Sequence, residues 1–146
     1  MNINLGMDNH YYYIPNFNSI GSNGYGDAPW INDDCINSII NVFIEDGFTR
    51  IGNYTFDGCN NLISVSIPES VTDIGYAFWG CHNIATIVCH SIYPPNINNT
   101  NSNGDVMDVF RDVNKTECVL YVPAEYEEAY RIAKGWEDFV NIKAIQ

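Results

Sequence analysis

The chain has 146 residues, which is long enough for one domain with its own hydrophobic core. Its 18 Asp and Glu residues against six Lys and Arg give a net charge of −12, and residues 1–49 contain neither Lys nor Arg. Such an acidic chain repels nucleic-acid phosphates and anionic lipid headgroups, which argues against both as partners.

Residues 1–24 are predicted to form an N-terminal extension that is partly disordered or acts as a cap. Within it, residues 1–10 are predicted to be disordered or to be a tag-like segment. The first residues lack the basic and apolar regions of a signal peptide. No apolar run in the chain approaches the roughly 20 residues that cross a bilayer, so membrane insertion is not expected. Large apolar side chains at residues 11–15 and 28–30 stand in an Asn- and Gly-rich stretch, and we predict an aromatic N-terminal cap over residues 25–38.

A repeated sequence dominates residues 39–95. Segment 51–67 reappears as segment 74–89, with an offset of 23 residues at the Ile-Gly pair that opens each copy and of 22 at Phe56 and Phe78. The second copy has therefore lost one residue after its Ile-Gly pair. A period of this length is typical of leucine-rich-repeat solenoids, in which each coil covers the hydrophobic face of its neighbour.

Short strands are predicted within each repeat. Residues 42–44, 65–67 and 87–89 alternate in a pattern typical of strands with one buried face. Stacked one above another, they form a parallel sheet. The segments that follow the first two, 47–52 and 70–75, turn the chain at a glycine, and the rest of each coil is predicted to be an irregular return segment.

Small and aromatic side chains recur at fixed places in the repeat. Phe56 and Phe78 are predicted to fill the coil interior. Cys59 and Cys81 each follow a glycine, which suits small buried side chains stacked in a ladder. The chain has five cysteines, an odd number without the density of a disulfide framework. We expect reduced, structural thiols, with a disulfide as the alternative.

The C-terminal third is predicted to be a loop followed by a cap. Residues 96–108 are rich in polar and small residues up to Gly104 and indicate a surface loop. The cap covers residues 109–146. It contains a last strand at 118–123, a helix at 124–134 that Gly135 ends, and apolar residues that fold over the last coil, namely Trp136, Phe139 and Ile142.

No constellation of residues predicts a metal site, a cofactor or catalysis. Cys81-His82 and Cys89-His90 carry zinc-type ligands, but strand alternation points each histidine away from its cysteine. The segment Asn99-x-Asn101-x-Asn103-Gly104 lacks a carboxylate at its first position and a bidentate Glu at its end. We interpret it as a flexible loop and leave calcium binding open. Nucleophile elbows, phosphate loops and zinc-protease motifs are absent from the sequence.

The surface expected to bind a partner is the exposed side of the stacked strands, because solenoids present an extended face. Strand alternation places an outward residue of each strand in one central column: Phe43, Ser66, Val88 and Tyr121. Asn41, Ser64 and Thr86 flank it. Aligned outward apolar residues often mark an interaction site. The alternative is that Phe43 and Val88 merely suit the propensity of a strand.

The consensus of the repeat resembles a known family. Residues 67–75 read Ile-Pro-Glu-Ser-Val-Thr-Asp-Ile-Gly and are followed by an aromatic residue and Gly-Cys, which is similar to the BspA-like leucine-rich repeats of about 23 residues. The resemblance spans about residues 25–146, including Ala28-Pro29-Trp30 at its start and Gly135-Trp136-Glu137-Asp138-Phe139 near its end. It implies one leucine-rich-repeat domain over these residues.

The resemblance also implies a function. Members of the family are bacterial, often surface-exposed or secreted, non-enzymatic modules associated with adhesion to host proteins and other bacteria. We therefore expect a protein–protein interaction or adhesion module without a cofactor, whose partner is a host or bacterial surface protein. The alternative is a structural or capping fragment of a longer repeat protein with no partner of its own. The absence of a signal peptide from this sequence leaves a cytoplasmic location open. The partner's identity and the oligomeric state are not predicted.

Overall fold

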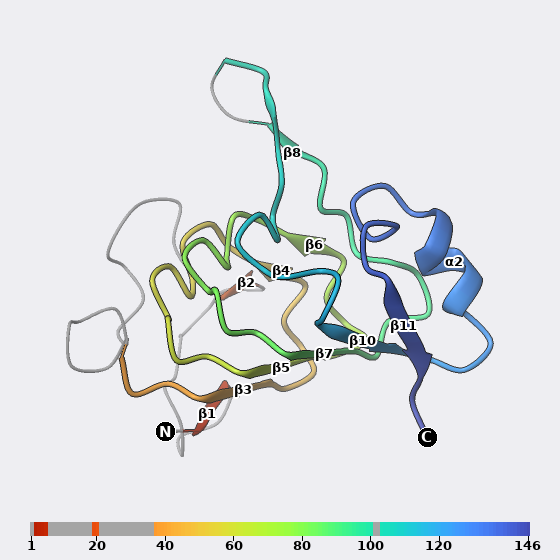
Figure 1. The fold of residues 1–146 in the computed structure, drawn as a ribbon, viewed down its shortest axis with the longest axis horizontal. Coiled ribbons are helices and arrows are strands. Elements are labelled where there is room, and N and C mark those ends of the chain that lie inside the picture. Colours follow the sequence, from red (N-terminus) through yellow and green to blue (C-terminus); the bar gives the residue numbers. More distant parts are fainter. Residues whose placement is uncertain (1, 6–18, 21–36, 101–102) are drawn as a thin grey trace.

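The structure, a computed structural model, describes residues 2–5, 19–20, 37–100 and 103–146 (Figure 1). A six-stranded parallel sheet runs along the molecule, with one strand contributed by each successive turn of the chain. In spatial order its strands are β1 (Asn2–Leu5), β3 (Asn41–Ile44), β5 (Ser64–Ile67), β7 (Thr86–Cys89), β10 (Val119–Val122) and β11 (Asn141–Ala144). The predicted solenoid of stacked parallel strands is confirmed.

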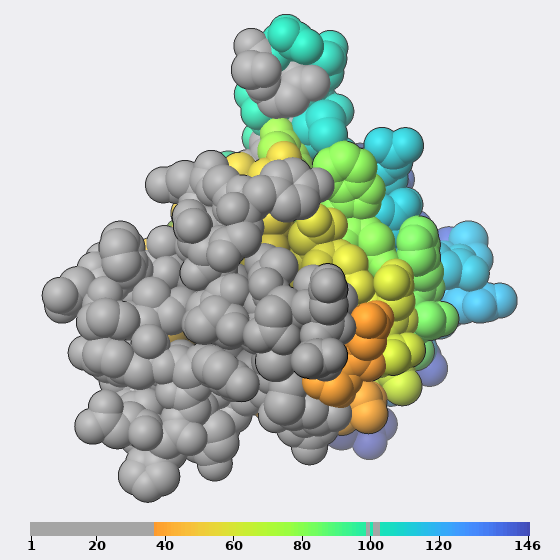
Figure 2. Space-filling model, turned by 90° about the vertical axis from the view of Figure 1, so that its left-hand side faces the viewer, coloured from red at the N-terminus to blue at the C-terminus, as the bar shows by residue number. Residues whose placement is uncertain are grey.

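A second, smaller parallel sheet lies on another side of the coils. Its strands are β2 (Ser19–Ile20), β4 (Arg50–Ile51) and β6 (Asp73–Ile74). β4 and β6 lie in the short extended segments that the sequence predicts before each glycine turn, whereas β2 was not predicted. Between the two sheets the chain returns through turns, and the coils stack in chain order from orange to blue (Figure 2).

Alternation decides which face of the main sheet is buried. In β5, β7 and β10, half-buried residues alternate with buried ones, and β3 differs only in having Phe43 exposed. Leu62 and Ile84 extend the buried side, as predicted. β5 ends at Ile67, before Pro68, because proline has no N–H to donate to the ladder.

A column of stacked phenylalanines fills the coil interior. The ring centroids of Phe56 and Phe78 lie 5.5 Å apart, and those of Phe78 and Phe110 lie 5.6 Å apart, with nearly parallel planes. The interior position predicted for Phe56 and Phe78 is confirmed. Phe110 extends the column into a third coil, where the Asp112 carboxylate accepts a hydrogen bond from the Gly80 N–H at 2.8 Å.

The missing residue of the second repeat corresponds to Asn53. The Tyr76 N–H donates to the Asn53 amide oxygen at 3.0 Å, and the Tyr54 N–H donates to the Tyr76 carbonyl. Asn53 thus fills the gap beside Gly75, where a Cβ would lie 2.2 Å from that amide oxygen. The strands stay in register, with Ser64 opposite Thr86, as the sequence predicts.

The expected loop over residues 96–108 is a hairpin. β8 (Asn99–Thr100) pairs in antiparallel orientation with β9 (Val106–Met107), and the hairpin projects from the coils (Figure 1). The sequence predicted a surface loop here but not the two short strands within it. Polar composition alone did not reveal backbone pairing, which satisfies the N–H and C=O groups of an exposed segment.

The C-terminal cap contains a shorter helix than the predicted 124–134, and one more strand than predicted. Helix α2 (Glu127–Ile132) is followed by a turn at Gly135, where φ is +83°. β11 then pairs with β10, so β10 is not the last strand. Trp136, Phe139 and Ile142 are buried as expected. Ile142 is buried from within the added strand.

The N-terminal segment contributes a strand that the sequence did not predict. β1 pairs with β3, with Ile3 opposite Val42 and Leu5 opposite Ile44, so the prediction of disorder was wrong for residues 2–5. Alternating polar and apolar residues in Asn2–Leu5 carry the same strand signal as in the repeats. The predicted aromatic cap, including residues 11–15 and 28–30, lies outside the described residues.

Candidate functional site

The exposed face of the main sheet is the candidate site, and it consists of columns of outward residues. The backbone register aligns Phe43 with Ser66, Ser66 with Val88, and Val88 with Tyr121. It also aligns Asn41 with Ser64 and Ser64 with Thr86. The structure therefore brings all seven predicted residues onto adjacent strands in the two columns that the alternation predicts.

The central column is uneven in size and exposure. Phe43 is 49% exposed, whereas Ser66, Val88 and Tyr121 are half-buried. Two further exposed apolar residues, Ile40 and Ile63, precede β3 and β5 by one residue. Apolar side chains on this face are therefore available to a partner, and Phe43 is the most exposed of those in the central column.

Polar residues in the columns are tied to one another across coils. The Ser64 hydroxyl donates to the Asn41 amide oxygen at 2.5 Å, and the Ser66 hydroxyl lies 3.3 Å from Nε2 of His90. Outside the two columns, Asn61 and Asn83 each donate a side-chain hydrogen bond to a backbone carbonyl of the preceding coil. Such inter-coil bonds hold the face in a fixed arrangement.

The face is longer than the sequence predicted. β11 adds Asn141 and Lys143 to its columns, opposite Val119 and Tyr121. At the other end, Asn2 and Asn4 take the register positions beside Asn41 and Phe43. The signal that would have found these positions is the four-residue alternation within each strand, which is weak in so short a segment.

An open hollow of about 470 Å³ adjoins the face where β3, β5 and β7 end. Ile44 and Pro68 contribute buried apolar surface, and Ser66 joins the hollow to the central column. The other lining residues, all exposed, are Glu45, Asp46, Glu69 and His90. The hollow therefore combines an apolar floor with a rim that carries three carboxylates.

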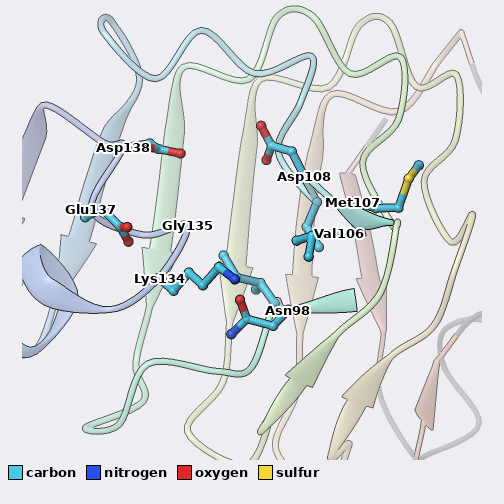
Figure 3. A pocket seen from close by; sticks show the side chains of 10 residues that line it. Asn98, Val106, Met107, Asp108, Lys134, Gly135, Glu137 and Asp138 are labelled. Carbon is cyan, nitrogen blue, oxygen red and sulfur yellow. The ribbon is translucent and has the colours of Figure 1, made fainter. Parts of the chain in front are cut away.

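A second hollow of about 250 Å³ lies between the hairpin and the C-terminal cap (Figure 3). Val106 and Met107 come from β9, whereas Lys134 and Glu137 come from the turn after α2. Asp108 at its edge is already engaged, because Lys115 Nζ lies 2.6 Å from its carboxylate. The lining mixes charges of both signs over an apolar base, which does not favour one class of ligand.

The described cysteines lie in the core rather than in a reactive environment. Burial raises the pKa of the Cys59 thiol to about 12 and those of Cys89 and Cys118 to about 11, and it also raises the pKa of Cys81. These four thiols are free of disulfides. A protonated thiol is a poor nucleophile and a poor metal ligand, which fits a structural role.

The paired Cys-His motifs do not converge on a metal. Cys81 and Cys89 are buried, whereas His82 and His90 are exposed, as strand alternation predicts. Within the described ranges, no three His, Cys, Asp or Glu side chains are grouped so that they could hold a metal ion.

The described part of the chain has no helix with the length and apolar character to span a bilayer.

Comparison with known proteins identifies the repeat. The family model described as a BspA type leucine rich repeat region, which comprises six copies, matches residues 32–103. These residues form a BspA-type leucine-rich-repeat region. No curated protein matches the chain. The BspA-type family and the solenoid fold indicate a protein-interaction repeat module, and leucine-rich-repeat proteins are generally non-catalytic.

Proposed function

We propose that the chain is a non-catalytic protein-binding module that contacts its partner through the exposed strand face. The observation that carries the proposal is the central column, in which Phe43, Ser66, Val88 and Tyr121 lie side by side on four parallel strands. The buried Val, Ile, Phe and Cys side chains of the repeat form the core, so they are not available to a partner. The outward residues differ from coil to coil, and that variation is what recognition of a specific partner requires.

Family membership supports a finer proposal about context. BspA-type repeats are typically found in surface or secreted proteins, and we propose an adhesive role at a bacterial surface, with a host or bacterial surface protein as the partner. The competing function is a structural segment of a longer repeat protein. Burial of Trp136 and Phe139 against Phe110 favours that alternative for the C-terminal cap, because these rings close the end of the core.

The test is binding of intact bacteria and host extracellular proteins to the immobilised chain, with and without changes on the face. Phe43→Ser combined with Tyr121→Ala is expected to weaken binding of the captured protein at least tenfold, because central anchors carry most of the binding energy of an interface. Ile132→Ser combined with Val106→Ser is the control, since these residues are 74% and 59% exposed on other elements.

Both double variants are expected to unfold only slightly below the temperature of the parent chain, because the changed side chains lie outside the buried core. A captured protein that binds the Phe43→Ser/Tyr121→Ala variant as tightly as the parent would reject the strand face as the contact. Absence of any captured protein would favour the structural alternative.

A further inference from the structure

We propose that the partner of the strand face presents a cationic segment, and that a Lys or Arg side chain of this segment enters the open hollow beside Ser66. This inference rests on the proposed function, because it assigns the chemistry of the partner at the same face. It is carried by the shape of the hollow, by the groups that line it and by the absence of Lys and Arg from the described residues around it.

The hollow reaches the central column at a small residue. Ser66 stands in register between Phe43 and Val88, and it is one of the residues that line the hollow. A partner that lies across the column therefore meets a large side chain at Phe43 and a recess directly beside it. The hollow has a volume of about 470 Å³ and is open to solvent.

The lining matches the two parts of a long basic side chain. Ile44 and Pro68 are buried and apolar, which suits the aliphatic stem of Lys or Arg. Glu45, Asp46 and Glu69 are exposed on the rim, where their carboxylates meet the charged head. An uncharged apolar side chain would satisfy the floor and leave the carboxylates without a counter-charge.

The described part of the chain supplies no Lys or Arg to the rim. The ion pairs found in the described part of the chain join Lys115 to Asp108 and Arg131 to Glu127. Residues 1–49 contain neither Lys nor Arg, so the N-terminal segment has neither of these two cations to compete for the rim. The rim carboxylates are thus available to a cation from outside.

The charge of the whole chain acts in the same direction. A net charge of −12 attracts cationic partners over distances of about a Debye length and raises their association rate. This attraction is not specific to one site. The experiment must therefore separate the hollow from the total charge.

The probe is a library of random peptides displayed on phage and selected on the full-length chain. The expected result is enrichment of Lys or Arg next to an apolar residue. For the consensus peptide, Glu45→Gln combined with Glu69→Gln is expected to raise the dissociation constant about tenfold, as measured by fluorescence anisotropy. The control is Glu128→Gln combined with Glu137→Gln, which removes the same charge from exposed positions in the C-terminal cap. It is expected to change the constant less than about twofold.

Two results would overturn the proposal. One is selection of peptides without Lys or Arg, or of no peptide at all. The other is an equal loss of affinity in both double variants, which would assign the attraction to total charge. Phe43→Ser separates this inference from the proposed function. If Phe43→Ser weakens peptide binding and the Glu45→Gln/Glu69→Gln variant does not, the strand face is the contact and the hollow is rejected as the cation site. If only the Glu45→Gln/Glu69→Gln variant weakens binding, the strand face is rejected as the main contact.

Discussion

At the scale of single residues, the buried side chains of Cys81 and Tyr130 are neutral and hydrogen-bonded. The Cys81 thiol donates to the Phe56 carbonyl, and the Tyr130 hydroxyl lies 2.7 Å from the Ser91 carbonyl oxygen and 3.2 Å from Cys89 Sγ. Burial also raises the pKa of Tyr130. These groups therefore keep their protons in the folded chain well above the pH at which they ionise in water.

The raised thiol pKa values predict a loss of stability in alkali. Above about pH 8.5 the cysteines of the unfolded chain lose their protons, whereas in the folded chain Cys59 titrates at about 12 and Cys89 at about 11. The unfolded state then binds fewer protons, so the free energy of unfolding falls as the pH rises through this window. Urea titrations between pH 8 and 11 measure the slope.

The matched variant for that measurement is Cys59→Ala combined with Cys81→Ala. Its absolute stability is expected to be lower because two small cavities are created. Its slope with pH is expected to be shallower than that of the parent chain. Equal slopes would show that these two thiols do not cause the alkaline loss.

Tyr130→Phe is predicted to destabilise the chain by about 1–3 kcal/mol, because the buried Ser91 carbonyl loses its hydroxyl donor. The ring itself remains and continues to pack edge-on against Trp136. Tyr93→Phe removes the same atom from a side chain that is 76% exposed, and its effect is expected to stay within about 0.5 kcal/mol. Urea midpoints compare the two, and similar losses would contradict the assignment.

At the scale of elements, each strand is too short to be stable alone and depends on its neighbours. β5 pairs with β3 through three residues and with β7 through all four. The phenylalanine column links the same coils through their return segments. Removal of one ring from this column therefore affects two coils at once.

Phe78→Ala is predicted to cost about 3–5 kcal/mol in the free energy of unfolding, because it leaves a cavity between two stacked rings. Phe43→Ala removes the same atoms from an exposed position and is expected to cost about 0.5 kcal/mol. Urea unfolding measures both changes. A small loss for Phe78→Ala would mean that the neighbouring rings collapse into the gap, contrary to the close packing inferred for the column.

The edge of the main sheet at β11 is protected by the adjacent helix. Arg131 of α2 donates from Nη2 to the Ile142 carbonyl at 3.0 Å, and it also lies 3.6 Å from the Glu127 carboxylate. An unpaired carbonyl on an edge strand would otherwise invite pairing with another chain. The helix therefore serves the sheet as well as the core.

At the scale of the whole molecule, the C-terminal cap covers with aromatic rings the end of the hydrophobic core, which would otherwise be exposed to solvent. Phe110, the last ring of the column, contacts both Trp136 and Phe139 at centroid distances of 5.2 and 5.3 Å. The indole N–H of Trp136 donates to the Pro95 carbonyl at 2.8 Å. These contacts connect the cap to the coil before it.

Truncation after Val122 is predicted to abolish cooperative unfolding, because the core end around Phe110 becomes exposed. Binding of the dye ANS is expected to rise, as it does when packed apolar surface is uncovered. Ile132→Ser in the full-length chain, a change at an exposed cap residue, is the control and is expected to leave both measurements unchanged. A truncated chain with the parent's urea midpoint would show that the coils do not need the cap.

The sequence by itself determined the repeat, its register and the outward columns. Period and alternation are local properties of the chain, and they were enough to place Phe43, Ser66 and Val88 side by side. Burial of Phe56 and Phe78 followed from the same pattern.

Only the tertiary structure revealed the elements whose signal is not local. β1 and β11 are four-residue strands that exist because an edge of the sheet receives them, and the hairpin of β8 and β9 forms within a polar segment. The open hollow beside Ser66 likewise brings together residues at the ends of three different strands. Pairing and enclosure depend on which segments meet in space, and the stacking of the coils decides that.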